Sequence, residues 1–100
     1  MLNLLRFDGE EGRAAYARYG EAVVPLIQEL GGQVVFSGPC AEAVIGPAER
    51  EWDAVLLVRY PSRRAFLDMI SSPAYGEAHP HRAAAIADSR LIPCSEGAPA

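Results

Sequence analysis

Four stretches of the chain have the length and apolar content of β-strands. The first, "LNLLRF", runs from Leu2 to Phe7 and stops at the turn-forming pair Asp8-Gly9. A second begins at Gln33, where the pair Gly38-Pro39 indicates an edge strand or a bulge, and it can resume through "EAVIG". The pattern predicts two further strands, over Trp52–Tyr60 and Ser89–Cys94.

Apolar residues recur at helical spacing in the two regions between these strands. The first helix is expected between Asp8 and Gly31-Gly32; Asp8 and Glu11 have the spacing of a capping box, and Pro25 should kink it. The second region carries three signals of a helix start. They are Ser62 as an N-cap after Pro61, and the cap-then-proline pairs Ser72-Pro73 and His79-Pro80. We therefore expect this crossover to be a helix broken into short pieces.

The order strand, helix, strand, strand, helix, strand predicts an α+β, ferredoxin-like βαββαβ domain with a four-stranded antiparallel sheet. We expect one domain over residues 1–94 and a disordered tail over 95–100. The third strand is apolar on both sides: the set that begins at Trp52 is predicted to face the helices, and the set with Asp53 and Arg59 to face outward. Because two helices cover only one face, the economical cover for the other is the same sheet of a second copy, which predicts a homodimer.

The amino-acid composition excludes or disfavours several classes of function. All nine basic residues are arginine, which excludes a Schiff-base lysine and a phosphate-loop lysine. With a net charge of -4 and scattered arginines, nucleic acid is not an expected partner, and no apolar run is long enough to predict a membrane span or signal peptide. Two cysteines, Cys40 and Cys94, without a Cys-x-x-Cys pair fit a reducing compartment, so we expect a cytoplasmic protein.

The only two histidines, His79 and His81, flank Pro80 and raise three interpretations. A shared metal is disfavoured because proline indicates a turn and no further ligands lie nearby in sequence, so no metal and no cofactor are predicted. A histidine that transfers protons or binds a ligand is the second interpretation, because its pKa lies near neutrality. Helix capping and surface solvation form the third.

Chain direction suggests where a site would lie. It places Arg6, His79, His81 and Arg82 at one end of the sheet, where they would converge on an anion such as a carboxylate. His79, His81 and Arg6 are the catalytic candidates. The ligand-binding candidates are Arg6, Arg59, Arg82, Asn3 and Tyr60. A salt bridge across the dimer is the alternative role of Arg59, and Tyr16 and Tyr19 are second-rank candidates whose alternative is packing on the sheet.

Several motifs together resemble one family over nearly the whole chain. They are "YARYG", "VVPLIQELGG", and "YPSRRAF" leading into "SPAY". In these the chain resembles the domain-of-unknown-function family numbered 1330, in the dimeric α/β-barrel group. The resemblance implies a ferredoxin-like subunit whose sheet pairs with a second sheet. Related dimeric barrels include small monooxygenases, isomerases and haem proteins, so fold alone leaves the chemistry open.

The sequence thus favours a small dimeric barrel that binds a modest organic molecule between sheet and helices. The ligand would be apolar or aromatic and could carry a carboxylate. Two alternatives stay open: a cofactor-independent monooxygenase or isomerase, in which a positive or imidazole group steadies an oxyanion, and a non-enzymatic dimerisation or regulatory module. Whether the protein is an enzyme is not decided by the sequence.

Overall fold

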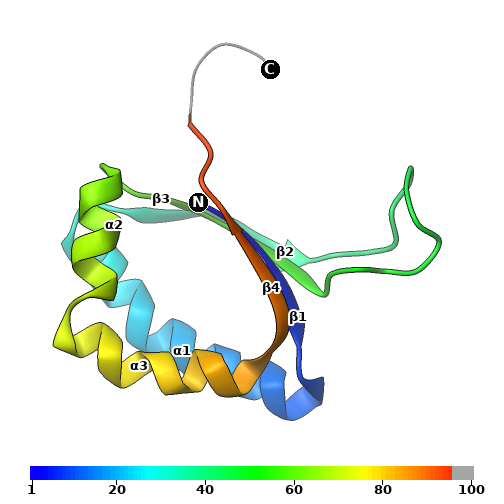
Figure 1. Ribbon diagram of the computed structural model, residues 1–100, viewed down its shortest axis with the longest axis horizontal. Helices are drawn as coiled ribbons and strands as arrows, with labels where there is room; N and C mark the ends of the chain where they lie inside the picture. The colour runs from blue at the N-terminus through cyan, green and yellow to red at the C-terminus, as the bar shows by residue number, and fades with distance from the viewer. Residues whose placement is uncertain (96–100) are drawn as a thin grey trace.

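The computed structural model describes residues 1–95 and has the predicted order of elements (Figure 1). One antiparallel sheet, in the order β2-β3-β1-β4, is formed by β1 (Leu2–Phe7), β2 (Gln33–Pro39), β3 (Ala54–Arg59) and β4 (Ile86–Ile92). The helices are α1 (Gly9–Glu29), α2 (Arg63–Ile70) and α3 (Pro73–Ala85), and Figure 1 shows all three on one face of the sheet. Strand order and element order are those of a ferredoxin-like fold, as expected. The tail predicted over 95–100 lies outside the described residues, apart from Ser95.

The glycine pair after α1 ends the helix and lets the chain turn closely into β2. Gly31 has a φ of +87°, a left-handed conformation that side chains disfavour, and the N–H of Gly32 donates to the carbonyl of Ile27 at 2.8 Å. A Cβ on Gly32 would lie 2.8 Å from the carbonyl oxygen of Arg59. The pair therefore sets both the end of the helix and its approach to β3.

The predicted helix starts of this region are confirmed at two of their three positions. Ser62 accepts a hydrogen bond from the N–H of Ala65, and Ser72 accepts one from the N–H of Tyr75. The third expected helix start, at His79-Pro80, is wrong because α3 runs through Pro80 without a break. Ala78 and Ala85 are buried on either side of Pro80, so packing of α3 outweighs the hydrogen bond that the proline removes.

Three further local predictions need correction. Asp8 is the N-cap residue of α1, but its side chain makes no capping bond; its N–H instead donates to the carbonyl of Ala85 at 2.9 Å. The "EAVIG" segment is not a strand and belongs to a long loop that projects from the molecule between β2 and β3 (Figure 1). β4 begins at Ile86, earlier than the predicted start at Ser89. The edge position predicted from Gly38-Pro39 is confirmed, since β2 is an edge strand and also carries a bulge.

The alternation of side chains along β1 defines the two faces of the sheet. Leu5 is 1% exposed and its neighbour Asn3 on the same face is 9% exposed, so this face meets the helices. In β3, Val58 is 2% exposed on that face, as the sequence predicted for its set. Leu2 lies opposite Leu57 on the other face, which no element of residues 1–95 covers. The apolar residues on this open face are Leu2, Leu4, Phe36, Val55, Leu57 and Ile92.

Trp52 breaks the parity that the sequence pattern suggested for β3. It precedes the strand, and its ring lies beside the guanidinium groups of Arg6 and Arg90, 5.6 and 5.2 Å from the ring centroid. Both arginines belong to the open face, because Arg6 alternates with buried Leu5 and Arg90 pairs with Leu4. The prediction that Trp52 faces the helices is therefore wrong. Asp53 instead turns toward the end of β1, where its carboxylate accepts the N–H of Phe7 at 2.9 Å.

Candidate functional site

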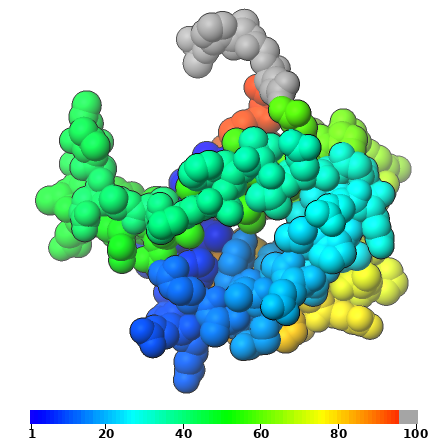
Figure 2. Space-filling model, turned by 180° about the vertical axis from the view of Figure 1, so that it is seen from behind, coloured from blue at the N-terminus to red at the C-terminus, as the bar shows by residue number. Residues whose placement is uncertain are grey.

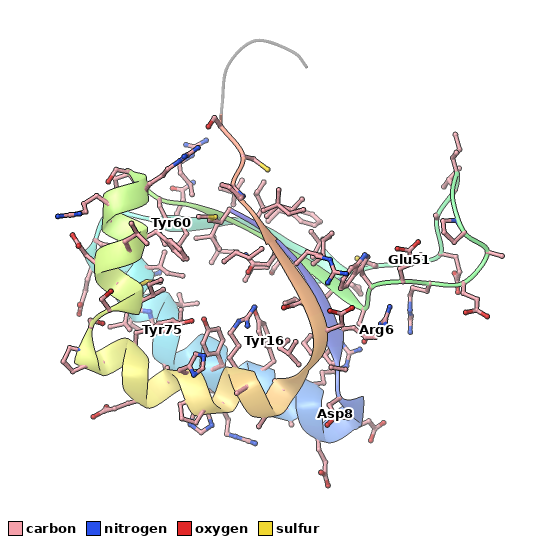
Figure 3. All side chains as sticks on the ribbon, in the orientation of Figure 1. Arg6, Asp8, Tyr16, Glu51, Tyr60 and Tyr75 are labelled. Atoms are coloured by element: carbon pink, nitrogen blue, oxygen red, sulfur yellow. The ribbon has the colours of Figure 1, made fainter. Side chains whose placement is uncertain are left out.

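All four tyrosines of the chain gather between the sheet and the helices. Tyr16 and Tyr19 come from α1, Tyr75 from α3, and Tyr60 follows β3. Figure 3 shows Tyr16, Tyr60 and Tyr75 in the space under the sheet. Ring centroids are 5.4 Å apart for Tyr16 and Tyr19 and 6.1 Å apart for Tyr19 and Tyr75, while Tyr60 packs edge-on against Phe66 at 5.1 Å. The cluster combines aromatic walls with several hydroxyl groups.

Tyr19 and Tyr75 share one hydrogen bond, with 2.9 Å between their hydroxyl oxygens. Since each phenol has one proton, a bond from one hydroxyl to the other leaves a single O–H free to donate elsewhere. Burial raises the pKa of Tyr16 and of Tyr19, and raises the pKa of Tyr60 to about 12. These hydroxyls therefore stay protonated near neutral pH and act as donors.

Arg82 is half-buried, whereas the other eight arginines are exposed. It lies on the face of α3 that also carries Tyr75, Ala78 and Ala85, at spacings of three and four residues. Its positive charge opposes the rise in pKa of Tyr16 and of Tyr19, which places its field within the tyrosine cluster. Within residues 1–95, Arg82 has neither an ion pair nor a hydrogen bond. A half-buried cation without a counterion favours a ligand that brings one.

A cavity of about 370 Å³ opens beside Tyr16, between α1 and the inner face of the sheet. On this side of the molecule the surface is hollowed between α1 and the β2–β3 hairpin (Figure 2). Arg13 is the only charged residue in its lining, and its guanidinium lies over the ring of Phe7 at 4.8 Å. The lining consists of Leu5, Phe7, Arg13, Tyr16, Ser37, Gly38, Pro39, Ala54, Val55 and Leu56. The volume suits a small molecule with a single aromatic ring.

The other predicted inner residues lie near this cluster to different degrees. Asn3 donates from Nδ2 to the carbonyl of Leu56 at 3.2 Å and forms no other side-chain hydrogen bond within the described chain. Its Oδ1 is not sealed from solvent, because no buried side-chain oxygen in this range lacks a partner. His79 is exposed, with its ring centroid 6.2 Å from that of Tyr75. His81 is exposed and carries no hydrogen bond or ion pair within residues 1–95.

Arg6 and Arg59 lie on the open face of the sheet, away from Arg82 and the histidines. Arg6 donates from Nε and from one terminal nitrogen to the carbonyl of Glu51, at 3.0 and 2.7 Å, and Figure 3 shows it at the base of the projecting loop. The structure therefore does not bring Arg6 together with His79, His81 and Arg82. Arg59 lines a larger depression of about 620 Å³ at the opposite end of β3, with Arg63 and Phe66.

Metal ligands do not gather in the structure. Among residues 1–95, no three side chains of His, Cys, Asp or Glu lie close enough to hold an ion. Cys40 and Cys94 are both free thiols. Nor is any helix in that range long and apolar enough to cross a bilayer.

Fold and site together define a ferredoxin-like α+β protein in which a cluster of tyrosines lies between an antiparallel sheet and its helices, next to a cavity lined in part by Tyr16 and Arg13. The family of domains of unknown function DUF1330 matches residues 10–93, and the chain belongs to that family. It is similar to the crystal structure of RPA0582, a protein of unknown function from Rhodopseudomonas palustris, with 42% identity and a TM-score of 0.81 over 95% of this chain and 81% of the other. Methylated RPA0582 matches with 44% identity and a TM-score of 0.82, over 97% and 81%. No curated protein matches the chain.

The sequence predicts Arg82, Asn3 and Tyr60 as ligand-binding candidates and Tyr16 and Tyr19 as second-rank ones, and it gives Tyr75 no role. Tyr16 and Tyr19 do pack in the core, and the hydroxyl of Tyr19 also forms a hydrogen bond with that of Tyr75. A signal for Tyr75 was present: it stands seven residues before Arg82, which on one continuous helix means the same face. The expected break at Pro80 hid that relation.

Proposed function

We propose that this protein binds a small aromatic molecule bearing an acidic oxygen in the cavity between α1 and the inner face of the sheet. The observation that carries the proposal is Arg82, a half-buried arginine without an acidic partner in the described chain, set among tyrosines. Rings such as those of Phe7 and Tyr16, 5.4 Å apart, supply an apolar wall for the aromatic part of the ligand. Arg13 in the wall of the cavity and Arg82 beside the tyrosine cluster supply the positive charge.

A binding assay with matched compounds tests this assignment. Benzoate and salicylate should perturb the amide resonances of Tyr16, Tyr19 and Tyr75, whereas benzamide and acetate should do so more weakly, because each lacks the charge or the ring. Arg82→Gln should weaken benzoate binding about tenfold, the order expected for a charged hydrogen bond. Arg18→Gln removes an exposed arginine of α1 and is the matched control. Equal binding by the two variants would refute the role of Arg82.

The same proposal includes a homodimer that packs open face to open face. The six apolar residues of that face would otherwise remain in water, and the described chain offers no third layer to cover them. A two-fold arrangement buries the same patch on both copies. The stacked group of Arg6, Trp52 and Arg90 lies on this face and has the residue types enriched in protein interfaces.

Two large apolar side chains of similar exposure provide a test of the dimer. Phe36 is 57% exposed on the open face and Leu67 is 50% exposed on α2. Phe36→Glu should shift the mass measured by light scattering from dimer to monomer, because it places a charge in the interface, while Leu67→Glu should leave a dimer. A monomeric wild-type protein at micromolar concentration would refute this part. The free thiols Cys40 and Cys94 support a reducing, cytoplasmic location, which fractionation of the host cell would check.

A further inference from the structure

The polar side chains around the tyrosine cluster are mostly hydrogen-bond donors. Arg82 beside the cluster donates only, as does Arg13 in the wall of the neighbouring cavity, and the Tyr19–Tyr75 pair leaves one free O–H. Asp53, just before β3, is already committed: its carboxylate accepts the N–H of Phe7 and pairs with Arg50 at 3.3 Å. The cavity lining itself contains no carboxylate.

Two effects compete for the charge of an acidic oxygen placed here. Loss of water favours its neutral form, and the tyrosines show that effect because burial is the largest cause of their raised pKa. A nearby arginine and directed O–H donors favour the anion. The backbone fixes the distance of each tyrosine hydroxyl from Arg82, whereas a ligand can move into direct contact with the guanidinium and the free hydroxyl. These groups therefore lower the pKa of a ligand's acidic oxygen more than they lower the pKa of the tyrosines.

We propose that the site holds its ligand as an oxyanion, so that acidic phenols and enols are ionised when they bind. This inference rests on the proposed function and adds the chemical class: the acidic oxygen is attached directly to an aromatic or conjugated carbon. Arg82 supplies the compensating charge, and the hydrogen-bonded pair of Tyr19 and Tyr75 supplies a directed donor. The polar and charged groups in or beside the tyrosine cluster come from every surrounding element: Arg82, His79 and Tyr75 from α3, Tyr16, Tyr19 and Arg13 from α1, Tyr60 after β3 and Asn3 from β1.

para-Nitrophenol is a suitable probe because its anion absorbs visible light and its neutral form does not. At a pH below its free midpoint, saturating wild-type protein should raise the visible absorbance as bound phenol loses its proton to buffer. We expect the pKa of the bound phenol to fall by at least about one pH unit, since an opposite charge nearby lowers an acid's pKa by roughly 1–3 units. By linkage, phenolate then binds about tenfold more tightly than phenol. para-Nitroanisole, which has no proton to lose, reports binding without ionisation.

Variants separate the contributions. Arg82→Gln should abolish the absorbance gain, and Arg82→Lys, which keeps the charge, should restore part of it. Tyr75→Phe removes one hydroxyl oxygen and should reduce the rise in absorbance. If Arg82→Gln does not fold, Tyr75→Phe is the variant that is compared with the wild type. Arg18→Gln lowers the net charge equally from an exposed position and should leave the gain intact.

The outcomes distinguish the two proposals. Binding of nitrophenol with an unchanged or raised pKa overturns the oxyanion inference and leaves the binding function standing. Saturable binding of neither nitrophenol nor nitroanisole at millimolar concentration overturns both. An absorbance gain that survives Arg82→Gln and Tyr75→Phe places the effect elsewhere and overturns this assignment.

Discussion

Gly12 of α1 and the end of α3 approach so closely that a single methyl group should separate them measurably. A Cβ built on Gly12 would lie 2.5 Å from the carbonyl oxygen of Ala85 and 3.2 Å from the Cβ of Asp8. The same carbonyl accepts the N–H of Asp8 at 2.9 Å, so it cannot move away without weakening that bond. Gly12→Ala must therefore displace backbone rather than a flexible side chain.

Two terms of opposite sign set the size of the effect. Replacing a helical glycine by alanine is worth about 0.5–1 kcal/mol in favour of the variant. Overpacking against backbone costs about 1–3 kcal/mol. The net expectation for Gly12→Ala is a loss of about 0–2.5 kcal/mol relative to the wild type. Gly20 lies in the same helix with nothing within 4 Å of its added Cβ, so Gly20→Ala should gain the full propensity term.

Chemical denaturation measures the free energy of unfolding of both variants. The two are compared at one protein concentration, because the proposed dimer would make stability depend on concentration. Thermal midpoints should move apart as well, by about 4–8 °C for each kcal/mol in a domain of this size. Two stabilised variants of equal free energy would show that α1 and α3 do not meet at Gly12 as described, and the close packing of Ala85 would have to be abandoned with it.

Two further predictions concern the tyrosines and the caps. The pKa of Tyr60 is raised in the folded protein from 10.0 to about 12, so its contribution to stability is present below pH 10 and is lost as the pH rises toward about 12. Tyr60→Phe should therefore flatten the plot of unfolding free energy against pH over that interval, measured by denaturation at stepwise alkaline pH. An unaltered plot would contradict the burial of Tyr60. Ser72→Ala should lower the free energy of unfolding by about 1 kcal/mol, because the Ser72 side chain caps α3 by accepting the N–H of Tyr75. Ser71→Ala breaks no side-chain hydrogen bond and should change the free energy little. Equal losses in the two variants would argue against the cap.

Local signals in the sequence were enough to predict the architecture. Apolar run lengths identify β1 and the core of β3, and Gly31-Gly32 marks the end of α1 because only glycine suits a left-handed turn and so close an approach to the carbonyl of Arg59. The failures come from long-range contacts. Pro80 stays inside α3 because Ala78 and Ala85 are buried against neighbours that no local window contains.

The candidate site was harder to predict for the same reason. Arg82 and Asn3 were chosen as polar residues in suggestive places, and they do lie on the inner side of the fold. Arg6 was assigned by the end of the strand at which it lies, but the pleat decides the face, and Arg6 alternates with buried Leu5. Trp52 was assigned by extending the alternation of β3 beyond the residues that form the strand, so its parity failed.

The pleat of β1 accounts for how one short strand serves two surfaces. Asn3, Leu5 and Phe7 point toward the helices, and their neighbours Leu2, Leu4 and Arg6 point to the open face. Packing against the helices and the proposed association through the open face thus use different residues, so a substitution that keeps the backbone in place can alter one side without the other. Arg82 and the tyrosines enter only from the helical side, so a ligand that binds there is held by one copy of the chain even where two copies share the sheet.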